Sequence, residues 1–251
     1  MTDKNAIVTT DGYYRNFYTK VLSGGSIGTV VDLVHRSLER DVPENFHAGV
    51  VLELGAGHGQ HKHYVHHSTG LYIETDLRES LLPQRPGSRR VDQSALSAAV
   101  AAHSGDGHTT LQAGLDAQDL SAIPSESIDR IIASCLLVHL PYPEKALSEW
   151  RRVARHGSIV TIYVAPEPGI VLRLGRACTT VRRARKLGTN HLSFHYREHI
   201  NHFPAMKMLI GDTFASDEIR WRAYPIPYAS WNLSLWKVTT IRVRKPEQAL
   251  D

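Results

Sequence analysis

Three glycines at alternate positions are the clearest sign of a ligand site in the sequence. They are Gly55, Gly57 and Gly59, and they lie between the apolar run VVLEL and a predicted helix over residues 60–67. Because glycine has no Cβ atom, a ligand can lie directly against the backbone there, at the N-terminus of the following helix. The dinucleotide fingerprint G-x-G-x-x-G would place its third glycine where Gln60 stands. The turn therefore predicts a ligand site and disfavours an NAD-dependent dehydrogenase.

Acidic residues lie at the ends of three predicted strands. Glu53 precedes the glycine turn, Asp76 ends the apolar run LYIETD, and Asp116 follows the strand HTTLQAGL. A single carboxylate of this kind often only caps the next helix, and a single glycine turn is often only a tight corner. In a parallel sheet, however, all three acids share one edge with the glycine turn, and that edge is where α/β sheets bind ligands. The set therefore indicates one binding site built from three strand ends.

In this order, the motifs resemble the class I S-adenosylmethionine-dependent methyltransferases, in particular the small-molecule, type 11-like group. The first motif of that family has the form acid-x-Gly-x-Gly-x-Gly after its first strand, as Glu53 to Gly59 has here. The segment 128–164 is similar to the family's fourth strand, substrate-facing loop, helix and fifth strand. The resemblance covers residues 48–165 and the two closing strands. The chain departs from the family pattern in the long spacer between its second and third acids.

The resemblance implies S-adenosylmethionine as the cofactor and gives roles to individual residues. Asp76 would bond the ribose hydroxyls, and Asp116 would meet the adenine amino group. Tyr14 and Tyr18 would fold over the methionine end of the cofactor, unless they only pack in the core of an amphipathic helix. The expected cofactor-binding residues are Tyr14, Tyr18, Glu53, Gly55, Ala56, Gly57, Gly59, Asp76, Leu77, Asp116, Ala117 and Ser134.

Histidines are the candidate acid–base catalysts. Methyl transfer from a sulfonium is an in-line displacement, so a base is needed only when the acceptor must lose a proton. His139 begins the predicted substrate-facing loop, although a structural bond to the backbone is the favoured interpretation of that residue alone. His191, His195, His199 and His202 would share one face of a helix, as a substrate face, a solvated face or a metal site, in that order of preference. The catalytic candidates are His139, His195 and His199. We expect no metal, because the sequence identifies no third ligand.

Six cations crowd the segment between the predicted fifth strand and the next helix. In this fold such a segment often forms a lid over the acceptor, where arginine side chains bind phosphate or carboxylate groups. The alternative is a solvated surface. Arg173, Arg182 and Arg183 are the predicted substrate-binding residues, for an anionic molecule such as a phosphorylated or nucleotide-linked sugar or a carboxylate. The insertion is also similar to those of bacterial methyltransferases from sugar and natural-product pathways. The six cations are Arg173, Arg176, Arg182, Arg183, Arg185 and Lys186.

A nucleic-acid methyltransferase is the alternative function, because a basic patch near aromatic residues is also typical of RNA binding. Enzymes that methylate exocyclic base amines carry an Asn/Asp-Pro-Pro-aromatic motif at the end of the fourth strand, where this chain has ASCL. A catalytically silent cofactor-binding subunit is a further alternative. We predict an enzyme that methylates an oxygen or nitrogen atom of a small, anionic biosynthetic metabolite.

The elements that must position these residues alternate between strand and helix. Four alternations over residues 48–165 indicate βαβ crossovers and a parallel sheet. We predict a doubly wound, Rossmann-like α/β fold with a seven-stranded sheet, parallel except for one antiparallel C-terminal strand. The single domain 1–251 would comprise an N-terminal helical cap (1–45), a cofactor-binding core (48–165), a basic lid insertion (166–202) and a C-terminal helix with strands (203–245).

Length and composition agree with a globular domain. The chain has 251 residues, of which 42% are hydrophobic and 22% charged, with a formal net charge of +4 and a pI near 9.1. Chains of this size bury a large core without disulfides or metals. Two cysteines, no readable signal peptide and no apolar run of about 18 residues predict a cytoplasmic protein that does not span a membrane. We expect a small-molecule substrate and no nucleic-acid partner, and we leave a homodimer open.

Overall fold

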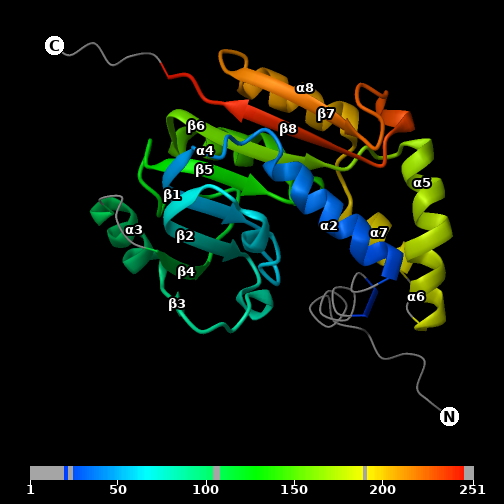
Figure 1. The fold of residues 1–251 in the computed structure, drawn as a ribbon, viewed down its shortest axis with the longest axis horizontal. Helices are drawn as coiled ribbons and strands as arrows, with labels where there is room; N and C mark the ends of the chain where they lie inside the picture. Colours follow the sequence, from blue (N-terminus) through cyan, green and yellow to red (C-terminus); the bar gives the residue numbers. More distant parts are fainter. Residues whose placement is uncertain (1–19, 22–24, 104–107, 189–190, 246–251) are drawn as a thin grey trace.

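The computed structural model describes residues 20–21, 25–103, 108–188 and 191–245. Within them lies a mixed sheet of eight strands in the order β3-β4-β2-β1-β5-β6-β8-β7 (Figure 1). β8 runs antiparallel to both of its neighbours, and the other neighbouring pairs are parallel. The strands are β1 (His47–Leu54), β2 (Ser68–Asp76), β3 (Ser88–Arg90), β4 (Thr109–Gly114), β5 (Ile128–Ala133), β6 (Ala154–Val164), β7 (Glu218–Tyr224) and β8 (Trp236–Arg242). The predicted doubly wound sheet with one antiparallel C-terminal strand is confirmed.

The predicted strand number of seven is one too low. The additional strand is β3, which pairs in parallel with β4 at the edge of the sheet, Ser88 lying opposite Thr110. It has only three residues, of sequence SRR, and none of them is buried. A strand this short and polar has no hydrophobic alternation, so its sequence carries no strand signal.

The helices of the described residues cover both faces of the sheet and the ends of its strands. None of them is both long and apolar enough to cross a bilayer. The helices are α2 (Gly25–Glu39), α3 (Gln93–Ala102), α4 (Pro143–Val153), α5 (Ile170–Arg176), α6 (Arg182–Lys186), α7 (His191–Glu198) and α8 (Phe203–Thr213). Shorter turns are the 3-10 helices η2 (His61–Tyr64), η3 (Glu79–Leu81), η4 (Leu137–His139) and η6 (Trp231–Leu233) and the π-helical turn η5 (Ala177–Val181).

One helix prediction is wrong. The helix expected over residues 60–67 is only the 3-10 turn η2, and the chain becomes extended at Val65. Beyond it, the His66 ring bonds to the Val42 carbonyl and the His67 ring packs on Phe46, so contacts with the segment before β1 replace further helical turns. Of the N-terminal helical cap predicted over residues 1–45, α2 lies within the described residues, and residues 1–19 fall outside them.

The layers follow from the alternation of buried side chains. On one face, Leu52 and Leu54 of β1 belong to a core cluster with side chains of α3, α4 and α8. On the other face, α2 crosses β6 and β8, where Leu38 packs with Trp236. In Figure 1, α5, α6 and α7 lie beyond the arrowheads of the parallel strands, and α2 extends toward them. The carboxyl edge of the sheet is therefore covered by α2 and by the helices of the basic insertion.

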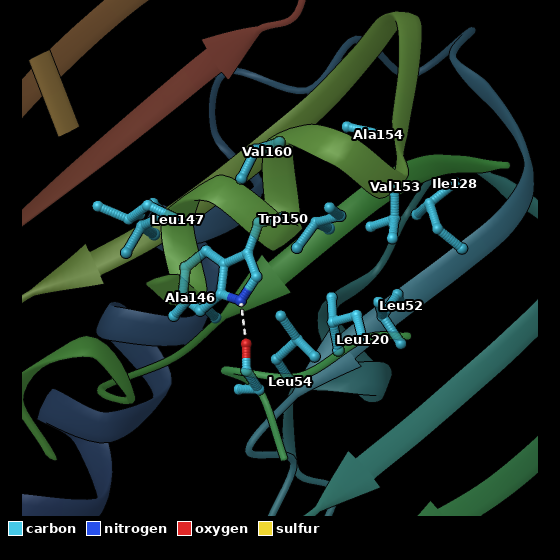
Figure 2. Packing of buried hydrophobic residues seen from close by; sticks show 14 of the residues in the cluster. Leu52, Leu54, Leu120, Ile128, Ala146, Leu147, Trp150, Val153, Ala154 and Val160 are labelled. Atoms are coloured by element: carbon cyan, nitrogen blue, oxygen red, sulfur yellow. Dashed lines mark hydrogen bonds between the residues drawn. The ribbon is translucent and has the colours of Figure 1, made fainter. Parts of the chain in front are cut away.

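One core side chain also supports the edge of the sheet. Trp150 of α4 is fully buried, among Leu52, Leu54 and Leu120 (Figure 2). Its indole Nε1 donates a hydrogen bond of 2.9 Å to the Ala117 carbonyl, the bond drawn dashed in Figure 2. A buried indole N–H needs an acceptor. Here the acceptor is in the loop after β4, so the bond fixes that loop to the core.

A buried ionic cluster holds α2 on the sheet. Glu39, the last residue of α2, accepts from Arg130 of β5 at 3.0 Å and from His61 of η2 at 2.8 Å. Burial opposes ionisation of Glu39, but the charge of Arg130 and the bond from His61 outweigh it and lower the pKa of that carboxyl to about 2. These bonds anchor α2, the helix that forms one wall of the site described below.

Candidate active site

A cavity of about 350 Å³ opens at the carboxyl edge of the sheet. Its walls come from α2, the glycine turn after β1, the loop after β5, and the helices α5 and α7. Of the predicted cofactor-binding and catalytic residues, Glu53, Gly55, Ala56, Ser134, His139, His195 and His199 line it. Tyr14 and Tyr18 fall outside the described residues.

The glycine turn has a backbone that only glycine adopts easily. Gly55, Gly57 and Gly59 have φ angles of 64°, 51° and 62°, all in the left-handed region. A Cβ atom at Gly55 would also lie 2.9 Å from a methyl group of Leu136. The Gly57 N–H donates to the Asp76 carboxylate at 3.1 Å, so the second acid fixes the turn that follows the first strand.

The three acids lie at adjoining strand ends, as predicted. Glu53 is in register with Glu74 of β2, and Asp76 is in register with Gly114 of β4, two residues before Asp116. Asp116 accepts from the backbone N–H of Gln118 at 2.9 Å. Neither Asp76 nor Asp116 lines the cavity, and the same is true of Gly57, Gly59, Leu77 and Ala117. Of these residues Leu77 is 69% exposed, Asp76 and Asp116 are half-buried, and the remaining three are buried.

Glu53 is a buried carboxyl at the cavity wall. It is 2% exposed and accepts a hydrogen bond of 2.7 Å from the Tyr72 hydroxyl. Burial raises its pKa to about 7, against the opposing influence of His61 and the Tyr72 bond. A cationic group bound beside Glu53 would lower the pKa of this carboxyl, since a nearby positive charge favours the ionised form.

The second polar group of the cavity is a cluster of histidines around one carboxylate. Glu167, three residues after β6, accepts from His199 Nδ1 at 2.6 Å and from Arg176 Nη2 at 2.5 Å. Arg176 Nη1 also lies 2.5 Å from His195 Nε2. Of the predicted histidine face, His191 and His195 lie in α7 and His199 just after it. His202 is the residue before α8, so it is not on that helix.

The hydrogen bonds assign the protons of these rings. His195 Nε2 has two neighbours, Arg176 Nη1 at 2.5 Å, which can only donate, and Glu167 Oε2 at 3.3 Å, which can only accept. The nearer contact favours Nε2 as the acceptor, with the proton on Nδ1. His139 Nδ1 lies 2.9 Å from the Glu198 carbonyl, which can only accept, so that nitrogen carries the proton. Burial lowers the pKa of His139 and lowers that of His199 to about 3, although the bond to Glu167 opposes the latter shift. Both rings are therefore neutral imidazoles at neutral pH.

The three arginines predicted to bind substrate do not line the cavity. Arg173 and Arg182 are exposed and Arg183 is half-buried. Of the six cations in the insertion, Arg176 alone lines the cavity, and its guanidinium is bonded to Glu167. The roles predicted for Arg173, Arg182 and Arg183 stay predictions.

Sequence reasoning missed Glu167, around which the polar cluster is built. Its position near the carboxyl end of β6 is the available signal, because the other acids of the site also lie at or near the carboxyl ends of strands. Cys135, two residues after β5, lines the cavity and was also not among the candidates.

Comparison with known proteins agrees with this architecture. Residues 52–162 match a family model described as a methyltransferase domain. A search of curated proteins finds no significant match. Among solved structures, a SAM-dependent methyltransferase from Archaeoglobus fulgidus is 14% identical, with a TM-score of 0.56, over 92% of this chain and 100% of its own. The PH0226 protein from Pyrococcus horikoshii OT3 is 14% identical, with a TM-score of 0.56, over 93% of this chain and 98% of its own. The CurJ carbon methyltransferase is 17% identical, with a TM-score of 0.54, over 94% of this chain and 58% of its own.

Proposed function

We propose that this chain is an S-adenosylmethionine-dependent methyltransferase that methylates an oxygen or nitrogen atom of a small molecule bound in the cavity, and the methyltransferase domain model that matches residues 52–162 supports the proposal. One observation carries the proposal: the cavity is bounded both by the glycine turn with Glu53 and by the cluster with His139 and His199. Its size is that of a small-molecule site, for which about 300–1,000 Å³ is typical. A cofactor at the turn and an acceptor at the cluster would therefore share one enclosure.

The residues at the sheet edge fit the cofactor. When bound, S-adenosylmethionine supplies an electrophilic methyl group on a sulfonium. Glu53, a buried carboxyl whose pKa is raised by burial, suits the cationic methionine end. The left-handed glycine turn lets a ligand approach the backbone without meeting a side chain. Asp76 and Asp116, half-buried at or near the ends of β2 and β4, are the residues we propose for the ribose and adenine.

The acceptor would bind between the lid helices and the histidine cluster. Val30 and Val34 of α2, Leu172 of α5 and Phe194 of α7 make the far walls apolar. At the polar end His139 and His199 are neutral, and we propose that His139 takes the proton of an acceptor O–H or N–H group, because the pKa of about 3 makes His199 the weaker base. His195 holds Arg176 through Nε2, which makes it a positioning residue rather than the base. We propose an acceptor with an apolar body and one nucleophilic polar group.

An anionic group on the acceptor would lie outside the cavity. Arg176 is already neutralised by Glu167, so an anion inside would have to displace that carboxylate. Arg173 and Arg182 instead project from the lid surface, where an anionic tail could meet them. We place the protein in the cytoplasm, in a biosynthetic pathway of the sugar or natural-product kind, on the strength of the sequence resemblance.

The test follows the methyl group. Purified protein is incubated with methyl-labelled S-adenosylmethionine and either a small-molecule extract or total RNA, and the label is located by size. The proposal expects label in the low-mass fraction only, absent from a parallel incubation with His139→Asn plus His199→Asn. Label in RNA would support the nucleic-acid alternative. No label in any fraction, with cofactor bound, would support a catalytically silent subunit.

A further inference from the structure

Three metal-ligand side chains meet at the polar end of the cavity. Cys135, His139 and His199 each offer one ligand atom, and these atoms all lie within 4.8 Å of one another. They come from separate segments: the loop after β5, the end of η4 and the residue after α7. A thiolate and two imidazoles are a ligand set typical of zinc, and three protein ligands leave a fourth position open.

The two histidines are oriented as metal ligands usually are. His139 donates from Nδ1 to the Glu198 carbonyl at 2.9 Å, and His199 donates from Nδ1 to Glu167 at 2.6 Å. In each neutral ring the lone pair is then on Nε2. Metal-binding histidines nearly always donate their other ring N–H to a carbonyl or carboxylate in this way, which fixes the ring and raises the basicity of the ligand nitrogen.

Cys135 has an uncommon backbone conformation. Its φ angle is 55°, in the left-handed region that non-glycine residues seldom adopt. The residue lies two positions after β5 and lines the cavity, whereas the second cysteine, Cys178, is exposed on the lid. The chain therefore contains its own matched control for the reactivity of a thiol.

A second group of possible ligands, Glu167 with His195 and His199, is already occupied by a cation. Arg176 bonds both Glu167 and His195 at 2.5 Å. The guanidinium fills the place of a metal ion there and uses the acceptor nitrogen of His195. Glu167 is left as the carboxylate that orients His199 from behind.

The geometry points to a divalent metal site of the zinc type, formed by Cys135, His139 and His199, with its open position toward the cavity. This inference goes beyond the proposed function and does not depend on it, since an ion can bind without cofactor or acceptor. With the ion bound, His139 and His199 serve as ligands rather than bases. The open position can then hold the acceptor's oxygen or nitrogen atom.

Cobalt(II) is the probe, because a cobalt–thiolate bond gives a near-ultraviolet charge-transfer band that the protein's many histidines cannot produce. The full-length protein, treated with chelator, is titrated with cobalt and then with zinc. We expect the band to saturate at one equivalent, to disappear when zinc is added, and to be absent from Cys135→Ser. Cys178→Ser should give the wild-type spectrum. His139→Asn and His199→Asn should each weaken cobalt binding at least about tenfold.

Two further variants separate this site from its neighbour. Glu167→Gln should keep the band but weaken binding by about 10–100-fold, the effect expected of a residue that orients a ligand. His195→Gln should leave the spectrum unchanged, and circular dichroism reports whether each variant is folded. The inference is overturned if wild-type protein gives no band, if Cys135→Ser keeps it, or if Cys178→Ser loses it. It is also overturned if His195→Gln abolishes binding while Cys135→Ser does not.

Discussion

Replacing Glu53 by glutamine removes a charge while keeping the size of the side chain and an acceptor for Tyr72. In the free protein Glu53 is 2% exposed and accepts from Tyr72 at 2.7 Å. If it binds the cationic methionine end of the cofactor, the bond is charge-assisted and contributes about 1.5–3 kcal/mol. Glu53→Gln should therefore weaken cofactor binding by about 10–150-fold, since each 1.4 kcal/mol or so is a factor of ten.

The pH dependence gives the same test a sign. Burial raises the pKa of Glu53 to about 7 in the free protein, whereas the bound cation favours the carboxylate. Binding therefore releases a proton below that pH, and affinity should rise with pH until about 7 is passed. The α-amino group of the cofactor loses its charge near about 7.7–8.0, so affinity should fall again above that range. Glu53→Gln should keep only the fall at high pH.

Isothermal titration calorimetry with S-adenosylmethionine or S-adenosylhomocysteine measures both effects. Repeating it in buffers of different ionisation enthalpy counts the protons released. Glu44→Gln is the control, because Glu44 is an exposed acid away from the cavity. The reasoning is refuted if Glu53→Gln binds the cofactor as tightly as wild type. It is also refuted if that variant keeps the rise in affinity below neutral pH.

Two other outcomes follow from the charges. The double variant Arg182→Ala, Arg183→Ala should raise the KM for the acceptor much more than the KM for the cofactor, and added salt should have the same effect on the wild type. If both KM values stay unchanged, the lid arginines are only a solvated surface. Glu39→Gln should lower the free energy of unfolding, measured by urea denaturation, by about 3–5 kcal/mol, because it leaves the fully buried Arg130 without its charged partner. Adding Arg130→Met should restore much of that free energy. Since the pKa of Glu39 is lowered to about 2, the wild type should lose this stabilisation as pH falls from about 4.5 toward 2, and Glu39→Gln should not.

The parts of the fold that could be predicted are those with local signals. The buried strand before Gly55, the positive φ angles of the turn and the acids at Asp76 and Asp116 all follow from residue type and short-range spacing. The strand β3 could not be found, because its three polar residues acquire their conformation only by pairing with β4.

The polar cluster around Glu167 could not be predicted from local sequence patterns. Glu167 bonds Arg176 nine positions away and His199 thirty-two positions away, and neither distance has a period that a helix or strand would leave in the sequence. The helical spacing of the histidines did bring His195 and His199 near one another, with ring centroids 3.9 Å apart. Their partners Glu167 and Cys135 depend on how β5, β6 and α7 pack together.

The most direct test of the central claim is cofactor binding to Gly57→Val. Gly57 has a φ angle of 51° and donates to Asp76, so a branched side chain there both strains the turn and occupies the approach to it. Gly157→Val is the matched control, because Gly157 has a φ of 77° with open space around its Cβ position, away from the site. We expect both variants to stay folded. Isothermal titration calorimetry should show that Gly57→Val has lost S-adenosylmethionine binding and that Gly157→Val retains it. Equal affinity in wild type and Gly57→Val would contradict the assignment of this edge as the cofactor site.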